Sequence, residues 1–409
     1  MKLKRLIGKD GLPFIDFAAI IFFSLYYILP SFSGSFNRTL VLFLGIGYFL
    51  YVLLKDRKIG VSFISIFTAV TVIAFAFLLL TETKTVAESA SNRLLKVFMS
   101  KFSQYFFMYL PGLFLIRVLK NANKEQKNAL LMLLLVLYII VLYNTFIVVL
   151  ENPDAVRSWE NFSEMEAENI GNYYFVYSVP IIITGLSVCM ARLKGFKKFF
   201  CLGFIFVLFV FLLLASYTLA VLIAVLGLIL QVFLSLKSPV TKILFIIAAV
   251  IALFFVPDLL LFISENAPSG NMAIRFKELY SFFTSGDSSG YNLNGRLTLY
   301  RMSIEAFLNS PIIGNRNLDF DGHATFLTVL ADTGIIGGIP FYYLLFSMNK
   351  RMKAFLNENA RNFIPAFFSL LLMGFTNPIH NSLPLAFAVW FIVPLIINAL
   401  INKEGEKVK

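Results

Sequence analysis

The stretch that decides the fold is residues 199–236, which read FFCLGFIFVLFVFLLLASYTLAVLIAVLGLILQVFLSL and contain no charged residue. As one α-helix, these 38 residues would be roughly 57 Å long, nearly twice the ~30 Å hydrocarbon core of a bilayer. We therefore expect two membrane spans, 199–214 and 218–236. They turn near Ala215-Ser216-Tyr217-Thr218, where small and polar residues interrupt the apolar run.

The rest of the chain has the same character. It has 409 residues, of which 59% are hydrophobic and 14% charged, and its mean hydropathy is +0.81. Soluble domains carry about 25% charged residues, so this composition predicts an all-α, polytopic membrane protein. Twelve spans are predicted, near 14–32, 36–54, 61–80, 98–116, 129–150, 173–191, 199–214, 218–236, 240–262, 324–347, 363–380 and 383–401.

The distribution of charge orients these spans. With the N-terminus inside, the inner segments hold 24 Lys and Arg residues and the outer segments hold 11. This asymmetry follows the positive-inside rule and predicts that both termini are cytoplasmic. It also explains the net charge of +12 without nucleic acid as a partner. The first span lacks a small-residue cleavage site, so we expect it to remain in the protein, which would be a multi-pass protein of the cytoplasmic (inner) membrane.

Three regions follow from this plan: residues 1–262 with spans 1–9, an outer loop at 263–323, and residues 324–409 with spans 10–12 and a cytoplasmic tail. The outer loop is the one long hydrophilic segment of the chain. Positive charge is scarce on the outer face of membrane proteins, so a cluster of cations there suggests a use. The cluster comprises Arg275, Lys277, Arg296, Arg301 and Arg316.

Within the loop, residues 294–311 are predicted to form an amphipathic helix, with Asn294 as its cap and Pro311 at its end. Its apolar stripe comprises Leu297, Tyr300, Ile304, Phe307 and Leu308. Arg296 and Arg301 flank that stripe on opposite edges. Either the two arginines reach lipid phosphates at the membrane surface, or they bind a phosphorylated lipid substrate bidentately. Residues 272–283 are a second candidate helix, which would add Arg275.

The end of the loop, Asp319-Phe320-Asp321-Gly322-His323, allows two interpretations. Two carboxylates and an imidazole at this spacing could bind a metal ion. Alternatively, His323 could act alone, as a base or hydrogen-bonding group where the loop enters span 10.

Residues 294–338 carry a more specific pattern. Gly295-Arg296 is followed by Arg301, then by Pro311-x-x-Gly314, and then by His323 opening a span that contains Thr-Gly334-x-x-Gly337. This order resembles the Wzy/O-antigen ligase superfamily of polysaccharide polymerases and ligases. The chain departs from that family at Ser216-Tyr217-Thr218, where a Ser-Arg pair is usual. Gly314-Asn315-Arg316 also replaces the more usual Gly-x-Gly.

The resemblance implies a GT-C-like glycosyltransferase that acts on undecaprenyl-pyrophosphate-linked oligosaccharides for capsule or lipopolysaccharide, at the outer face of the membrane. It assigns Arg296 and Arg301 to the departing pyrophosphate. It assigns His323 to the acceptor proton or to the pyrophosphate itself. No cofactor and no metal are expected. Besides membrane lipid, a chain-length regulator (polysaccharide co-polymerase) is an implied partner.

Four further residues are candidates for binding the pyrophosphate or the glycan. Arg275 and Arg316 could replace the missing basic residue. Asp332 lies about nine residues into span 10, where a charge usually faces a cavity or a partner in the bundle. His380 falls at the outer face in Thr376-Asn377-Pro378-Ile379-His380-Asn381, where it could join the site or simply lie at the interface.

Two other functions stay open. An O-antigen ligase would use the same donor with a lipid or protein acceptor, and the motif does not separate it from a polymerase. A lipid or polysaccharide transporter or flippase would need polar residues within several spans, commonly with broken helices. Because the polar chemistry here gathers on one face, the sequence favours the polymerase.

Overall fold

The computed structural model describes residues 11–79, 90–157, 162–190, 193–267, 270–286, 291–315 and 324–401. Every regular element in these ranges is a helix, as the sequence predicts. The α-helices are α2 (Phe14–Ile28), α3 (Pro30–Ser35), α4 (Arg38–Lys55), α5 (Arg57–Leu79), α6 (Ala90–Asn121), α7 (Lys124–Glu151), α8 (Phe162–Ala167), α9 (Tyr173–Met190), α10 (Phe196–Leu214), α11 (Thr218–Ser235), α12 (Pro239–Phe254), α13 (Val256–Glu265), α14 (Gly270–Ser285), α15 (Tyr291–Asn309), α16 (Thr325–Leu356), α17 (Ile364–Thr376), α18 (Leu383–Phe387) and α19 (Val393–Ile401). The short elements are η1 (Ala155–Arg157), η2 (Asn357–Phe363), η3 (Ile379–Asn381) and η4 (Ala388–Ile392).

Seven helical stretches in the described residues are long and apolar enough to cross a membrane, or up to eight if the bent pair α12–α13 forms one span. Three shorter apolar helices coincide with further predicted spans, at Phe14–Ile28, Tyr173–Val188 and Leu383–Ala399. The stretch Thr325–Thr376, counted once among the seven, contains two predicted spans, 324–347 and 363–380. The protein is therefore a helical, polytopic membrane protein, and the count of twelve crossings stays a prediction.

The turn predicted in the long apolar run is confirmed. Helix α10 ends at Leu214 and α11 begins at Thr218. Ser216 adopts a positive φ of 56°, and two bonds close the helix end, Ser216 N to Leu213 O at 3.0 Å and Tyr217 N to Leu212 O at 3.4 Å. This pair of bonds is the Schellman pattern, which satisfies carbonyls that a helix end leaves without partners.

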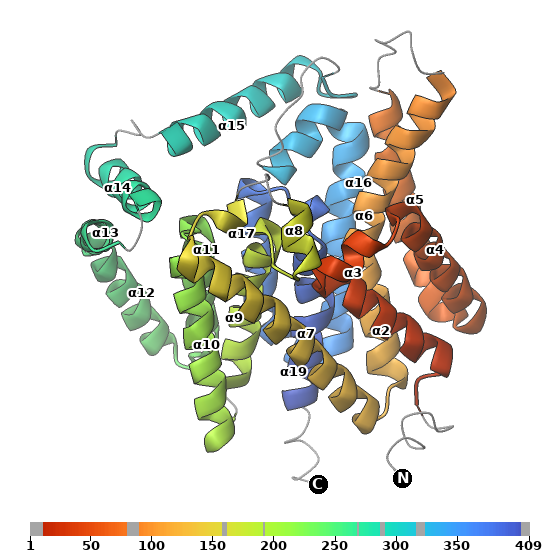
Figure 1. Cartoon of the computed structure of the whole chain (residues 1–409), viewed down its shortest axis with the longest axis horizontal. Coiled ribbons are helices and arrows are strands. Elements are labelled where there is room, and N and C mark those ends of the chain that lie inside the picture. Colours follow the sequence, from red (N-terminus) through yellow and green to blue (C-terminus); the bar gives the residue numbers. More distant parts are fainter. Residues whose placement is uncertain are drawn as a thin grey trace.

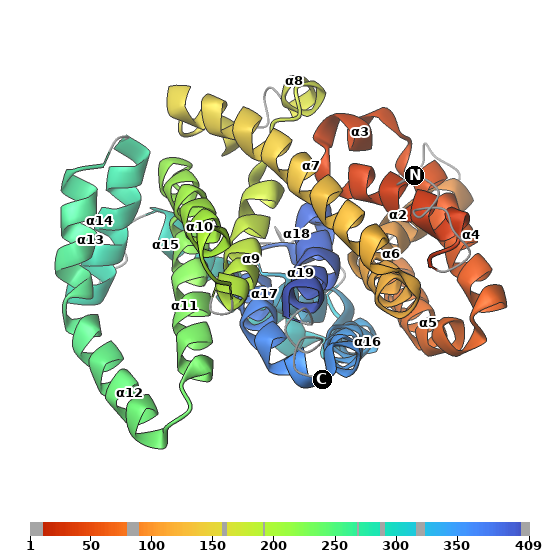
Figure 2. The same ribbon diagram turned by 90° about the horizontal axis from the view of Figure 1, so that it is seen from below.

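The predicted span 240–262, by contrast, is not one straight helix. Helices α12 and α13 meet at a bend of 46°. Pro257 lies in the first turn of α13, where its missing N–H and its ring prevent the preceding helix from continuing. None of the residues of α12 is buried, and Figures 1 and 2 show α12, α13 and α14 beside the main bundle rather than within it.

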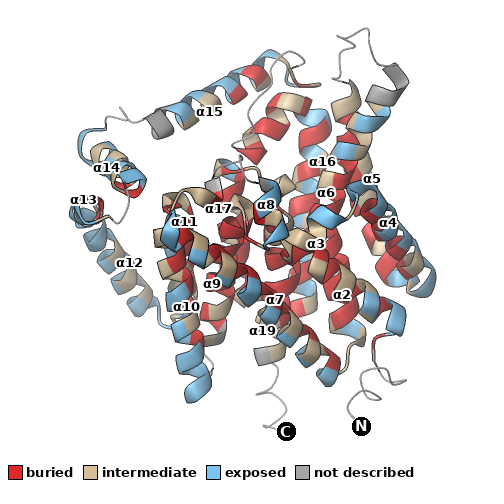
Figure 3. Ribbon diagram, viewed as in Figure 1, coloured by how far each residue is buried: buried red, intermediate tan, exposed pale blue. Residues whose placement is uncertain are grey.

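Helix α6 is the central element of the bundle. It packs against α5 and α16, and its Tyr105, Phe107 and Phe114 are fully buried. The peripheral helices expose apolar side chains instead, such as Phe199 and Phe206 on α10, and Figure 3 shows these outer faces as pale blue ribbon. Exposed apolar faces around a buried centre are expected where lipid is the solvent.

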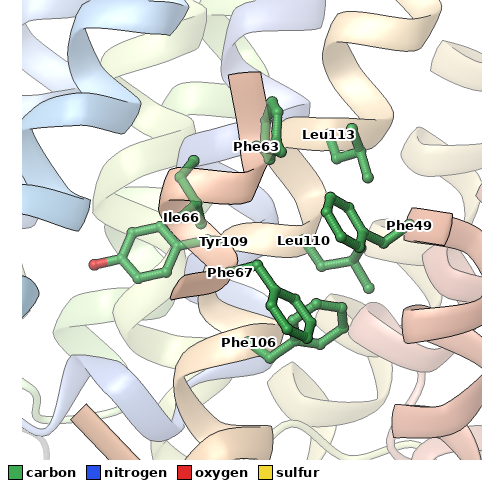
Figure 4. Close-up of a pocket in the computed structure, with 8 residues that line it drawn as sticks. All are labelled: Phe49, Phe63, Ile66, Phe67, Phe106, Tyr109, Leu110 and Leu113. Atoms are coloured by element: carbon green, nitrogen blue, oxygen red, sulfur yellow. The ribbon is translucent and has the colours of Figure 1, made fainter. Parts of the chain in front are cut away.

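Packing between α4, α5 and α6 leaves one small void of about 20 Å³. Phenylalanine rings from all three helices line it, among them Phe49, Phe63 and Phe106, and the hydroxyl of Tyr109 points away from it (Figure 4). An apolar void of this size stays dry. It belongs to the packing of the bundle rather than to a binding site.

A buried ion cluster joins α2, α4 and α6 near the end of the bundle at which α2 begins. Arg117 of α6 binds both oxygens of Asp16, which is fully buried, and also donates to Asp56 Oδ2 at 3.3 Å. Tyr48 donates to Asp16 Oδ1 at 2.7 Å, and Lys120 pairs with Asp56 at 2.6 Å. Removing one member of a buried pair typically costs about 3–5 kcal/mol, so this cluster fixes how α4 lies against α6.

The two ends of the bundle differ. Helix α2 begins and α19 ends at the same end, whereas α15 lies across the opposite end (Figure 1). We call the latter the α15 end. The candidate site residues that the structure describes lie mainly there.

Candidate functional site

At the α15 end, the Pro311-x-x-Gly314 segment docks against a break in α16. The break is at Gly334, whose φ of 57° and ψ of −152° are not helical. Three backbone bonds close the contact: Ile335 N to Pro311 O at 2.8 Å, Ile336 N to Ile312 O at 3.2 Å, and Asn315 N to Ala331 O at 2.8 Å. The backbone N–H and C=O groups freed at the break in α16 thus form hydrogen bonds with the loop, because buried backbone polar groups require hydrogen-bond partners.

Glycine is required at two positions of this contact. A Cβ on Gly334 would lie 2.5 Å from the backbone of Ile312, and one on Gly314 would lie 2.2 Å from the Asp332 carbonyl oxygen. Both glycines also have positive φ, 57° and 78°, and the conformation of Gly334 is essentially open to glycine alone. The P-x-x-G and T-G-x-x-G elements of the sequence pattern are therefore two halves of one contact.

The second component of the site is the turn between α17 and α18, residues 376–381, which we call the 376–381 turn. Thr325, at the start of α16, connects to it three times. Its hydroxyl donates to Asn377 O at 2.9 Å, accepts from Ile379 N at 2.8 Å, and lies 3.3 Å from His380 Nδ1. Residue Ala324, just before it, is also buried. The start of α16 is thereby fixed against the 376–381 turn.

Arg296 connects α15 to the same turn. Its Nη1 donates to the carbonyl oxygen of Thr376 at 3.2 Å. Its guanidinium also hydrogen-bonds with the hydroxyl of Tyr300, one turn further along α15. Burial raises the pKa of Tyr300, and the nearby Arg296 cation opposes that rise. Arg296 is half-buried, and its charge is not paired with a carboxylate in the described residues.

Arg301, the second arginine of the predicted pair, lies on the opposite face of α15. Its side chain is 81% exposed and pairs with Glu305 at 2.8 Å. Of the predicted apolar stripe, Leu297, Ile304 and Leu308 are exposed, and their contact with the membrane surface stays a prediction. Ser303 and Ala306 of this helix are buried, because α15 packs against α16. The structure thus brings Arg296 to the site and leaves Arg301 outside it.

His380 lies within the 376–381 turn. Its ring stacks on Tyr105 of α6, with ring centroids 5.5 Å apart and planes at 17°. Burial, together with the positive charges of Lys101 and Arg38, lowers the pKa of His380 to about 3. At neutral pH this imidazole is therefore uncharged, and it is surrounded by cations and phenol rings.

Asp332 lies two residues before the break in α16, and its carboxylate interacts electrostatically with Lys101 and Tyr105. The sequence left open whether Asp332 faces a cavity or a partner in the bundle. The structure gives it α6 as its neighbour. Lys101 in turn lies over the ring of Phe77, at 4.3 Å from its centroid. Asp332 thus links the broken helix to the cationic surroundings of His380.

A row of tyrosines runs between Arg38 and Arg296. The Tyr173 and Tyr174 rings are 3.9 Å apart, and Tyr177 and Tyr217 pack edge to face at 5.5 Å. Tyr174 interacts with Arg38 and hydrogen-bonds with Asn381, while Tyr177 interacts electrostatically with Tyr300. Tyr177 and Tyr217 are buried, whereas Tyr173 and Tyr174 are only partly buried. A phenol offers an apolar ring and a polar tip, so the partly buried end of the row can contact both the faces and the hydroxyls of a sugar.

Of the remaining predicted residues, the structure describes Arg275 and leaves it away from the 376–381 turn. Arg275 is on α14, which packs mainly against α13 through Met272 and Phe276. His323, Arg316, Asp319 and Asp321 lie outside the described residues. Elsewhere, in the described ranges, no three His, Cys, Asp or Glu side chains lie close enough to hold a metal ion.

Sequence reasoning missed Thr325, Lys101, Arg38 and Tyr174. All four lie within or next to apolar spans, where a single polar residue attracts little notice. One signal was available: Arg38 and Lys101 are among the few cations on the side predicted to be outer. Their partners come from segments far away in sequence, so no local pattern connects them.

Neither models of known protein families nor curated protein sequences match this chain.

Proposed function

We propose that this protein is a polymerase of lipid-linked oligosaccharide repeat units. It transfers a growing glycan from undecaprenyl pyrophosphate to the next lipid-linked repeat at the outer face of the cytoplasmic membrane. The observation that carries the proposal is the position of Arg296. A half-buried guanidinium without a carboxylate partner in the described residues lies beside the 376–381 turn, and the start of α16 is fixed to that same turn.

The reaction requires one group that stabilises the leaving pyrophosphate and one group that accepts a proton from the acceptor hydroxyl. The acceptor hydroxyl forms a bond to the anomeric carbon as the bond from that carbon to the pyrophosphate oxygen breaks. The lipid pyrophosphate leaves with the electron pair, and the hydroxyl gives up its proton. Arg296 would stabilise the departing negative charge, because fixed donors aimed at developing charge make a large contribution to catalysis.

His323 is the candidate for accepting the proton, since it directly precedes Ala324 and Thr325 in the chain. The unperturbed pKa of histidine, near 6.5, suits a base at neutral pH. His380 is less suited, because its lowered pKa makes it a weak base. The tyrosine row offers a surface for the glycan, and countercharge from arginine needs no metal ion.

The two arginines of α15 provide a matched test. In a strain deleted for the gene, Arg296→Ala should restore less than about 1% of wild-type polymer, in line with the 10²–10³-fold loss on removing one stabilising donor. Arg296→Lys should recover little of the activity, because it loses the bidentate fork. Arg301→Ala removes the same charge from the exposed face and should keep at least half of the polymer.

Polymer is measured as the length distribution of the glycan on a gel, with the variant proteins quantified by immunoblot. Accumulation of single repeat units in the deletion strain is the expected phenotype. Full-length polymer that fails to reach its final acceptor would instead indicate a ligase. Wild-type polymer from Arg296→Ala would remove the basis of the proposal.

A further inference from the structure

A cavity of about 410 Å³ opens between the first turn of α4 and the first half of α6. Arg38 and Lys96 contribute two positive charges to its wall, and Thr39, Ser100 and Ser103 contribute hydroxyls. The volume is within the usual range of small-molecule sites, about 300–1,000 Å³. The walls combine cations and hydroxyl donors with a few apolar side chains, which suits a phosphate group attached to an apolar chain.

The two cations of this cavity are not neutralised by the described part of the protein. Neither Arg38 nor Lys96 forms an ion pair or hydrogen bond with a described residue. The guanidinium of Arg38 lies 5.9 Å from the centroid of the Phe107 ring, which holds the side chain without satisfying its charge. Arginine with free donors recognises phosphate bidentately.

The cavity borders the candidate site. Arg38 interacts electrostatically with His380 and with Tyr174, and Tyr174 hydrogen-bonds with Asn381. Arg296 contacts the other end of the same turn, at Thr376. The 376–381 turn therefore has one uncompensated arginine near each end, with His380 between them.

Access from the bilayer is also plain. Leu40, Phe43 and Leu44, on the same helix as Arg38, are about half exposed. This apolar face of α4 adjoins the cavity, so a lipid chain in the membrane can lie along α4 while its headgroup enters.

We infer that the cavity between α4 and α6 is a second phosphate-binding site, which takes the pyrophosphate headgroup of a polyprenyl-linked lipid. The inference rests on the proposed function in naming this lipid. Polymerisation joins two lipid-pyrophosphate substrates, and the two arginine positions at the ends of the 376–381 turn provide one site for each. The tyrosine row between them would hold the glycan where the two substrates meet.

The test is the stoichiometry of binding to purified protein in detergent, measured by native mass spectrometry with a polyprenyl pyrophosphate as the probe. Wild-type protein should bind two molecules. Arg38→Gln/Lys96→Gln should bind one, and so should Arg296→Ala. The matched control is Arg57→Gln/Lys58→Gln, which removes two exposed charges at the other end of the bundle and should still bind two.

Further probes separate the sources of phosphate. The polyprenol without phosphate should bind equally to all variants, and excess phosphatidylglycerol should not displace the pyrophosphate lipid. Two molecules bound to Arg38→Gln/Lys96→Gln would overturn the inference. Displacement by phosphatidylglycerol would also overturn it, because the cavity would then hold only bulk lipid headgroups.

The binding assay requires no turnover, so it is independent of the test of function. If the deletion strain keeps full-length polymer while binding behaves as expected, the proposed polymerase fails and the phosphate site stands. Thermal melting and size-exclusion profiles of each variant check that it is folded. Arg38→Lys is a milder change that keeps the charge and should weaken binding several-fold without removing it.

Discussion

At the scale of single residues, surroundings decide what an ordinary side chain can do. His380 has no distinguishing neighbour in the sequence, yet in the fold it stacks on Tyr105 and faces the cations Lys101 and Arg38. Arg296 and Arg301 are five positions apart on one helix, yet one reaches Thr376 and the other pairs with Glu305 in solvent. Spacing alone predicted that the two arginines flank the apolar stripe of α15. Which of them faces the protein is decided by the packing of α15 against α16.

His380 leads to a prediction about pH. Its pKa in the folded protein, about 3, is below the value near 6.5 of an unfolded chain. As pH falls below about 6.5, the unfolded state therefore binds the proton first, and stability is lost until the pH reaches about 3. Replacing His380 with Gln should reduce this acid sensitivity.

The measurement is the midpoint of thermal unfolding in detergent at pH 7, 5.5 and 4. The midpoint of wild type should fall more steeply than that of His380→Gln over this range. Equal slopes for the two proteins would show that His380 is not held neutral by its surroundings.

At the scale of elements, the sequence predicted pieces well and their contacts poorly. The turn at 215–218 was predictable because a 38-residue apolar run is too long for one crossing, a constraint that needs no tertiary information. The bend between α12 and α13 was missed although Pro257 marks it. For α15, the sequence predicted an apolar stripe at the membrane surface but not the packing of this helix against α16.

The contact between Pro311–Gly314 and the break in α16 gives the prediction at this scale. Gly334→Ala and Gly314→Ala should each destabilise the protein, since strained backbone alone costs about 1–3 kcal/mol and each added methyl overlaps backbone atoms. Both should also abolish polymer formation, because the chain leading to Thr325 would lose its anchor.

Gly295→Ala is the matched control. Gly295 lies on α15 directly before Arg296, and a Cβ there meets nothing within 4 Å. Alanine also favours a helix over glycine by about 1 kcal/mol, so this variant should keep wild-type activity and melt at the same or a higher temperature. If Gly334→Ala matches Gly295→Ala in both polymer formation and melting temperature, the contact between the loop and α16 is not needed for stability or activity.

At the scale of the whole molecule, the exposed apolar side chains and the candidate-site residues lie in different parts of the bundle. Apolar side chains are exposed around the periphery, while the uncompensated cations and the tyrosine row gather towards the α15 end. The sequence indicated this separation through its charge asymmetry. It could not indicate that Arg38, Lys101 and Arg296 all lie around the 376–381 turn that contains His380, since they lie on separate helices that only the bundle brings together.

The last prediction concerns which end of the bundle faces outward. From the 24-to-11 distribution of Lys and Arg, we expect the α15 end to lie outside the cytoplasm. In a background in which Cys189 and Cys201 are replaced, a cysteine at Thr284 of α14 should react with a membrane-impermeant thiol reagent on intact cells or spheroplasts. Cysteines at Lys58 and Glu358 should react only after the membrane is opened.

All three test positions are exposed in the structure, so a difference in labelling reports the side of the membrane rather than burial. Lys58 lies in the first turn of α5 and Glu358 follows α16. The two lie far apart in the sequence, which guards against one misassigned span. Labelling of Lys58→Cys and Glu358→Cys in intact cells, with Thr284→Cys protected, would invert the topology. The candidate site would then face the cytoplasm, and the proposed polymerisation at the outer face would be ruled out.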